Sequence, residues 1–134
     1  MFIVTDASLW VARLVSEDVF YQPVKAWMVA RLGEDDQFLA PSLLLAEIGG
    51  AISRRTTSAL ALRAIDQVQS LPGLQLIEME QSLIRDAAQL AAELGLRGAD
   101  STYVAVALRL DLPLITLDTD QRQKAAKRVK VLTV

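Results

Sequence analysis

Short apolar runs of the kind that form buried strands alternate with longer stretches of helical periodicity along this chain. Strands are predicted at Phe2–Thr5, Gln37–Ala40, Leu74–Met79 and Leu114–Thr116, with a final edge strand at Val129–Val134. Helices are predicted at 7–15, 23–32, 43–52, 58–71, 81–94, 100–110 and 118–128. This alternation favours an α/β fold, a three-layer α/β/α domain with a mostly parallel central sheet, formed as a single domain over residues 1–134.

The two residue types that are missing exclude several kinds of chemistry. The chain contains no cysteine and no histidine. It therefore has no disulfide, thiolate nucleophile or zinc ribbon, and no Ser-His-Asp triad or imidazole ligand. Any catalysis must use carboxylates, hydroxyls, Lys, Tyr and a bound cation, and sites built from oxygen atoms alone suit Mg²⁺ or Mn²⁺.

The composition is that of a folded chain without a membrane segment. Hydrophobic residues make up 52% and charged residues 22%, which is enough to bury a core. The longest uncharged apolar run, Phe38–Ala46, contains Pro41 and Ser42 and falls well short of the roughly 20 residues that span a bilayer. The first ten residues lack the pattern of a signal peptide, so we expect a cytoplasmic protein with no membrane partner.

Acidic residues follow two of the predicted strands directly. Asp6 comes after the first strand, and Asp118 and Asp120 come after the strand that ends at Thr116. Ligands of open parallel sheets bind beyond the carboxyl ends of the strands, so these acids are expected at one edge of the sheet. Thr116 and Ser8 would add hydroxyl groups to the same place.

Helix capping is an alternative role for these acids. Asp6 could cap the first helix, Asp118 or Asp120 the last one, and Asp100 the apolar helix that follows it, since Asp is a favoured capping residue. A capping carboxylate can also face a cleft, so the two roles are compatible.

Glu47 lies inside an apolar helix without a visible partner. The residues three and four positions away are Leu43, Leu44, Gly50 and Ala51. None of them can pair with a carboxylate, and a glutamate is rarely buried unpaired. The side chain therefore turns to solvent or faces a site that holds a cation, and we favour the second interpretation.

Acids gathered at one edge would need a counter-charge. Two carboxylates about 4 Å apart repel each other by about 4 kcal/mol at an effective dielectric constant of 20. Protonation relieves this repulsion, and so does a divalent cation. A cation held in this way can activate a water and stabilise the charge that develops on a phosphodiester.

Four segments in order carry a resemblance to a known family. They are Ile3–Ser8, a strand with an acid and a serine; Pro41–Glu47, a glutamate in an apolar helix; Gly98–Ala107, an acid before a buried helix; and Leu114–Asp118, which ends in Thr-x-Asp. The segments Lys124–Ala126 and Val129–Leu132 also fit. Together they resemble the PIN-domain ribonucleases, and most closely the VapC-like toxins of VapBC-type toxin–antitoxin pairs.

This resemblance implies a PIN fold and Mg²⁺- or Mn²⁺-dependent endonucleolytic hydrolysis of RNA, leaving 5′-phosphate and 3′-hydroxyl ends. It also implies a homodimer and inhibition by a small cognate antitoxin. The residues that match the family's catalytic and metal-binding acids are Asp6, Glu47, Asp100 and Asp118, with Ser8, Thr116 and Asp120 as supporting candidates. Ser101 and Thr102 depart from the small or apolar residues that are commoner after the third acid.

Basic and aromatic residues leave further alternatives open. Basic side chains concentrate near the end of the chain, at Arg122, Lys124, Lys127, Arg128 and Lys130, and could contact phosphates, although a solvated helix face is the favoured interpretation. Other candidate contacts to a substrate or partner are Arg13, Arg54, Arg55 and Arg97. Trp10, Phe20, Tyr21 and Trp27 favour core packing, or else line a groove for an antitoxin helix or a dimer face.

Two other functions compete with the ribonuclease hypothesis. One is a catalytically inactive PIN-like module that binds RNA or protein, and it would require a lost acid or lost metal binding. The other is phosphoryl transfer, because Asp118-Thr119-Asp120 is similar to the Asp-x-Asp of haloacid dehalogenase-type phosphatases. We discount the second, since that motif belongs after a first strand and here stands near the end of the chain.

Overall fold

Five strands form one sheet in the computed structural model, which describes residues 1–134. The strands are β1 (Phe2–Thr5), β2 (Gln37–Pro41), β3 (Leu74–Ile77), β4 (Leu114–Ile115) and β5 (Val131–Leu132). Their order across the sheet is β3-β2-β1-β4-β5, and every neighbouring pair is parallel. The predicted parallel sheet is therefore confirmed.

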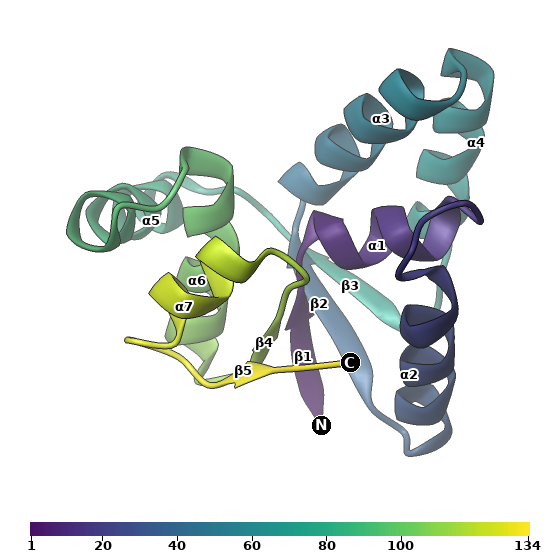
Figure 1. Cartoon of the computed structure of the whole chain (residues 1–134). Helices are drawn as coiled ribbons and strands as arrows, with labels where there is room; N and C mark the ends of the chain where they lie inside the picture. Colours follow the sequence, from purple (N-terminus) through teal and green to yellow (C-terminus); the bar gives the residue numbers. More distant parts are fainter.

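Seven helices connect the strands and cover both faces of the sheet. They are α1 (Ala7–Leu14), α2 (Tyr21–Gly33), α3 (Leu43–Arg55), α4 (Ser58–Gln69), α5 (Gln81–Leu94), α6 (Gly98–Leu110) and α7 (Thr119–Ala125). Figure 1 shows α1 to α4 on one side of the sheet and α5 to α7 on the other. The predicted three-layer α/β/α architecture is thus confirmed.

The core lies where the central strands meet the helices. Ile3 and Val4 of β1 are fully buried, as expected for a strand with neighbours on both sides and helices on both faces. In α6 all residues from Ser101 to Ala107 are buried, which agrees with a helix that is apolar nearly all round. The hydroxyl groups of Ser101 and Thr102 donate to backbone carbonyls one turn earlier, so these polar side chains are satisfied inside the core.

Glycines determine two local features of the helical layers. Gly95 ends α5 in the left-handed conformation, with φ of 68°, as its place after the amphipathic run predicts. At Gly49 a Cβ atom would lie 2.9 Å from Cδ1 of Ile65, so α3 and α4 approach closely there. This contact gives a physical reason for a glycine at position 49, inside a helix where glycine is otherwise unfavourable.

Several element ends differ from the prediction. Ser42 is a favoured residue type for the N-cap of the helix predicted at 43–52, but its side chain makes no capping hydrogen bond to α3. The strand predicted to reach Met79 ends at Ile77, and the last helix stops at Ala125 instead of 128. The final strand is only two residues long, at the expected edge of the sheet. No helix is long and apolar enough to cross a bilayer.

Candidate functional site

Asp6 is the most buried acid at the carboxyl edge of the sheet. Its amide donates to the carbonyl of Ile115, which joins the ends of β1 and β4, and its side chain is only 4% exposed. The hydroxyl of Ser8 donates to Oδ1 at 2.6 Å, and the hydroxyl of Thr116 donates to Oδ2 at 2.5 Å. Oδ1 also accepts from the amide of Leu9 at 3.4 Å, so Asp6 caps α1 as well.

Burial makes Asp6 harder to ionise. Loss of solvent raises the pKa of its carboxyl to about 6, although the hydrogen bonds from Ser8, Thr116 and Leu9 act in the opposite direction. The negative charge of Asp100 adds a smaller upward effect. Asp6 and Asp100 therefore lie near enough to interact, even though 94 positions of sequence separate them.

Asp100 and Asp118 share one guanidinium group. Nε of Arg97 donates to Oδ2 of Asp100 at 2.8 Å, and Nη2 of Arg97 donates to Oδ2 of Asp118 at 2.8 Å. Both carboxylates raise the pKa of Arg97, Asp100 more strongly than Asp118. Arg97 is 74% exposed, so this bridge lies at the surface where solvent can compete with it.

The helix caps resolve the alternative roles of these two acids. Asp118 caps α7, because its Oδ1 accepts from the amide of Gln121 at 3.0 Å. Asp100 does not cap α6: the helix begins at Gly98, and Asp100 lies in its first turn. There the carboxylate is favoured by the helix dipole, and its Oδ2 accepts from Arg97 instead of from a backbone amide of the helix.

Glu47 has a partner that the sequence analysis did not identify. Its Oε1 accepts from the hydroxyl of Tyr103 at 2.5 Å, across the boundary between α3 and α6. Burial raises the pKa of Tyr103 above its ordinary value, and the carboxylates of Glu47, Asp6 and Asp100 add to this effect in that order. Tyr103 therefore stays protonated, and its hydroxyl lies within the electrostatic range of three acids.

Asp120 is directed away from these groups. Its side chain is 70% exposed and pairs with Lys124 one helical turn later, with 2.8 Å between Oδ2 and Nζ. The structure thus does not bring Asp120 to the other acids. It brings Asp6, Glu47, Asp100 and Asp118 to one edge, with the hydroxyls of Ser8 and Thr116.

Two residues at this edge, Tyr103 and Gln121, were not assigned a site role from the sequence, and Arg97 was considered only as a contact to a substrate or partner. Tyr103 lies three positions after Asp100 in α6 and shares its helical face, whereas Arg97, three positions before Asp100, immediately precedes the helix. That spacing from Asp100 was the one feature of the sequence that could have indicated Tyr103 and Arg97. Gln121 is fully buried, lies 3.1 Å from the Thr116 hydroxyl and donates to the carbonyl of Asp100 at 3.4 Å, which no pattern in the chain indicates.

The oxygen atoms of the site are of the kind that bind hard cations such as Mg²⁺ and Mn²⁺. All candidate ligands are carboxylate or hydroxyl oxygens, and two of the carboxylates already hold a positive group, Arg97. As the side chains stand, however, no three acids are close enough together to hold one metal ion. An ion bound by the Oδ2 atoms of Asp100 and Asp118 would have to displace the Arg97 guanidinium.

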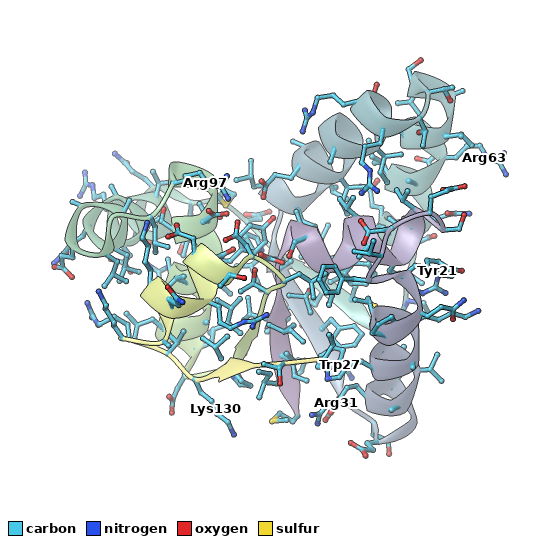
Figure 2. The ribbon with its side chains drawn as sticks, in the orientation of Figure 1. Tyr21, Trp27, Arg31, Arg63, Arg97 and Lys130 are labelled. Atoms are coloured by element: carbon cyan, nitrogen blue, oxygen red, sulfur yellow. The ribbon has the colours of Figure 1, made fainter.

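Three of the basic residues near the end of the chain are engaged in contacts within the protein. Lys124 pairs with Asp120, Arg128 pairs with Glu93 at 2.9 Å, and Arg122 donates to the carbonyl of Thr116. The carbonyl of Lys130 accepts from Leu114 at the start of β4, so Lys130 lies at the opposite end of the sheet from the acids. Figure 2 shows Lys130 and Arg97 at these two ends.

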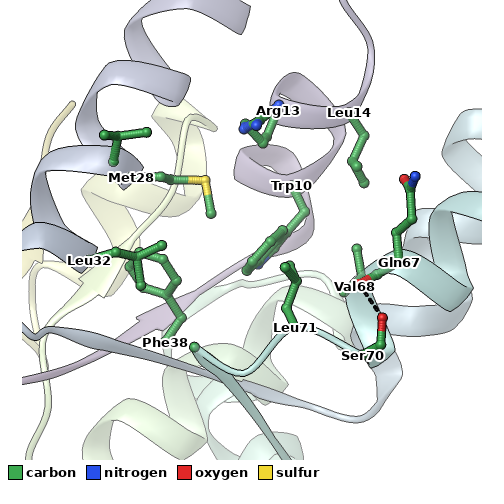
Figure 3. A pocket seen from close by; sticks show the side chains of 12 residues that line it. Trp10, Arg13, Leu14, Met28, Leu32, Phe38, Gln67, Val68, Ser70 and Leu71 are labelled. Carbon is green, nitrogen blue, oxygen red and sulfur yellow. Dashed lines mark hydrogen bonds between the residues drawn. The ribbon is translucent and has the colours of Figure 1, made fainter.

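The aromatic residues of the first two helices take different roles. Trp10 is buried, donates to the hydroxyl of Thr5 at 2.9 Å and packs edge-on against Phe38, while Trp27 stacks on the same ring. Trp10 and Phe38 also line an apolar pocket of about 590 Å³, which Figure 3 shows together with Met28 and Leu32. Core packing and a groove are thus combined here.

An all-parallel α/β sheet with acids gathered beyond its strand ends defines a class of domain. The family model of the PIN domain matches residues 3–127 of this chain. The chain therefore belongs to the PIN domain family, as the four sequence segments suggested. No curated protein sequence matches it.

Solved structures share this fold over nearly the whole chain. The toxin VapC20 of Mycobacterium tuberculosis, described as cleaving the sarcin-ricin loop, is 20% identical with a TM-score of 0.77, covering 96% of this chain and 98% of its own. VapBC2 of Rickettsia felis, bound to promoter DNA, is 14% identical with a TM-score of 0.74 and 98% coverage of both chains. FitAcB of Neisseria gonorrhoeae is 19% identical with a TM-score of 0.71, covering 98% and 96%. These likenesses establish a VapC-like fold.

Proposed function

We propose that this protein is a metal-dependent endoribonuclease, the toxin of a toxin–antitoxin pair, acting in the cytoplasm. The observation that carries the proposal is the gathering of Asp6, Glu47, Asp100 and Asp118 at one edge of the sheet, from four separate segments of the chain. Families of proteins can share a fold and differ in activity, so the acids and not the fold support the reaction.

Each residue of the site has a proposed role. Asp6, Asp100 and Asp118 would bind Mg²⁺ or Mn²⁺, and Glu47 would bind the ion or orient the attacking water. Ser8 and Thr116 hold the Asp6 carboxylate from both sides and so fix its direction. A bound divalent ion would supply an activated water and stabilise charge on the scissile phosphate.

The test uses the purified protein and a single-stranded RNA with Mg²⁺ or Mn²⁺. We expect cleavage that leaves 5′-phosphate and 3′-hydroxyl ends and that is lost in Asp6→Asn. The control is Asp120→Asn, which removes the same charge from an acid outside the cluster and should retain activity. Full activity of Asp6→Asn, in protein shown to be free of wild type, would contradict the assigned site.

A binding module without catalysis is the second candidate. It is favoured by the Arg97 bridge, which occupies oxygen atoms of Asp100 and Asp118 that a metal ion would use. Titration with Mn²⁺ by calorimetry separates the two functions. The nuclease should bind Mn²⁺ in a manner that requires Asp100 and Asp118, and the inactive module should show no such binding.

A small antitoxin and a second copy of the chain are the proposed protein partners. Several solved structures with this fold are described as toxin–antitoxin complexes, such as that of Klebsiella pneumoniae. The apolar pocket beside Trp10 and Phe38 offers a surface for an apolar segment of such an antitoxin. Toxins and antitoxins of this kind are usually encoded side by side, so induced expression with and without a neighbouring small gene tests the pairing. Only expression of the toxin alone should arrest growth.

A further inference from the structure

A second pocket extends from the acids along one face of α3. Its volume is about 670 Å³, and Ser8, Glu47 and Asp118 line the end that belongs to the acidic site. Arg54, Arg55 and Phe20 line the other end. The pocket therefore joins the candidate catalytic acids to a region with cationic and aromatic side chains.

Arg54 lies on the same helical face as Glu47. Glu47, Gly50, Ala51 and Arg54 follow each other at intervals of three, one and three residues, and all four line the pocket. At 1.5 Å per residue, Arg54 is about 10 Å from Glu47 along the axis of α3. Its long side chain places the guanidinium within reach of a neighbouring phosphate on a strand that passes over Glu47.

The absence of a side chain at Gly50 allows Arg54 to lie back along the helix. A Cβ atom at position 50 would be 3.1 Å from Nη1 of Arg54, closer than ordinary packing. The guanidinium therefore rests over Gly50, on the side of Arg54 that faces Glu47. Because Gly50 has no side chain, nothing projects into the pocket between Glu47 and Arg54 at this position.

Arg54 is the unpaired cation of this pocket. Arg55 donates to Asp18 at 2.8 Å, and no carboxylate lies within 4.0 Å of Arg54. The Asp18–Arg55 pair has a different role: Asp18 also accepts from the amide of Phe20 at 2.9 Å. These contacts hold the segment before α2 against α3 and keep Phe20 at the pocket, with its side chain 44% exposed.

We propose that this pocket is a nucleotide subsite for single-stranded RNA, in which Arg54 binds a phosphate and Phe20 stacks on an unpaired base. The proposal rests on the proposed ribonuclease function, since the acids at the other end of the pocket define the substrate. Arginine suits phosphate because its planar fork donates two hydrogen bonds, and an exposed ring accepts any base. Unpaired bases are required because stacked, paired bases cannot reach such a ring.

The test measures RNA binding apart from cleavage. Binding of the full chain to a fluorescein-labelled single-stranded RNA is followed by anisotropy in EDTA over a range of salt concentrations. For Arg54→Ala we expect about tenfold weaker binding and a slope of log K against log salt that is smaller by about 0.7, as for the loss of one phosphate contact on a single strand. Arg54→Lys should keep the wild-type slope.

Phe20 provides a second, independent readout. Phe20→Leu should weaken binding several-fold with an unchanged salt slope, because stacking releases no counterions, and Phe20→Trp should bind at least as tightly as wild type. The matched control is Arg63→Ala. Arg63 is also exposed and unpaired, but it belongs to α4 (Figure 2) and does not line the pocket, so its loss should change neither affinity nor slope.

The outcomes separate this subsite from the function on which it rests. If wild type cleaves the RNA in Mn²⁺ while Arg54→Ala and Phe20→Leu bind as wild type does, the subsite is wrong and the nuclease stands. If wild type neither cleaves nor binds RNA, both proposals fall. If Arg54→Ala loses binding to the proposed antitoxin but not to RNA, the pocket belongs to a protein partner and the subsite is overturned.

Discussion

Burial makes the charge of Asp6 costly, and the three hydrogen bonds donated to its carboxylate offset only part of that cost. With the pKa raised from 3.8 to about 6, the folded protein binds more protons than the unfolded chain between these pH values. Stability from this residue is therefore present at low pH and is lost as the pH rises through about 6. Two pKa units correspond to about 3 kcal/mol.

Asp6→Asn should stabilise the protein in EDTA at pH 7.5 by up to about 3 kcal/mol, and by much less at pH 4.5. The amide avoids the buried charge, and Thr116 can accept from it while donating to Gln121, which lies 3.1 Å away. Urea denaturation at the two pH values measures the difference. An equal effect at both, or a loss of stability at pH 7.5, would show that burial does not perturb Asp6.

Tyr103→Phe should lower the free energy of unfolding by about 1 to 2 kcal/mol, because Glu47 loses the donor to its half-buried carboxylate. Cleavage should also fall, though less than in Asp6→Asn, since Glu47 keeps its charge but loses its orientation. Urea denaturation and RNA cleavage provide the two measurements. Tyr21→Phe is the control, because the Tyr21 hydroxyl makes no hydrogen bond within the chain and its loss should change neither quantity.

Residues at strand ends could be placed from the sequence, and contacts between helices could not. Asp6 and Asp118 follow short apolar runs, so the parallel sheet alone predicts their common edge. The contact between Tyr103 and Glu47 joins positions 56 residues apart and depends on how α3 and α6 flank the sheet. The contact of Arg97 with Asp118 could not be predicted either, because it depends on how closely the start of α6 approaches the segment before α7.

At the scale of elements, periodicity was most informative where helices are long. The limits of α5 were predicted to the residue, because its apolar stripe and terminal glycine agree. The end of α7 and the length of β5 were not, since short elements at the edge of the sheet carry few periodic positions. Among the helices that carry the site, α3 ends at Arg55 instead of 52 and α6 begins at Gly98 instead of 100.

Gly95→Ala should destabilise the protein by about 1 kcal/mol. The left-handed conformation at the end of α5 costs residues with a Cβ atom about that much, although no neighbouring atom would meet the new methyl group. Gly98→Ala is the matched control: Gly98 also has open space around it, but it begins α6 with a negative φ and should be neutral or stabilising. Thermal unfolding of both variants is the measurement. A lower midpoint in Gly95→Ala alone shows that the left-handed backbone at position 95, and not the replacement of a glycine as such, causes the loss of stability.

At the scale of the whole molecule, the order of the strands brings the site together, because the chain changes the side of β1 on which it adds strands. The chain adds β2 and β3 on one side of β1 and then returns to add β4 and β5 on the other, so the acids after β1 and β4 become neighbours. The order of the strands itself was not predicted from the sequence, because every order of parallel strands shows the same alternation.

Millimolar Mn²⁺ should raise the midpoint of thermal unfolding in wild type, and EDTA should reverse the shift, because an ion that binds only the folded chain stabilises it by mass action. A concentration one hundred times the dissociation constant corresponds to about 2.7 kcal/mol. Asp118→Asn should lose most of the shift. The control Asp120→Asn should keep it, and an equal loss in both variants would point to binding outside the cluster.

The two border strands of the sheet, β3 and β5, are four and two residues long. Strands this short expose few free amide and carbonyl groups to a passing chain, and natural proteins use such truncation to avoid uncontrolled polymerisation. Recognition by strand addition is correspondingly disfavoured. Association with the proposed second copy or antitoxin would thereby be directed to the helical layers, where shape and side-chain chemistry select the companion.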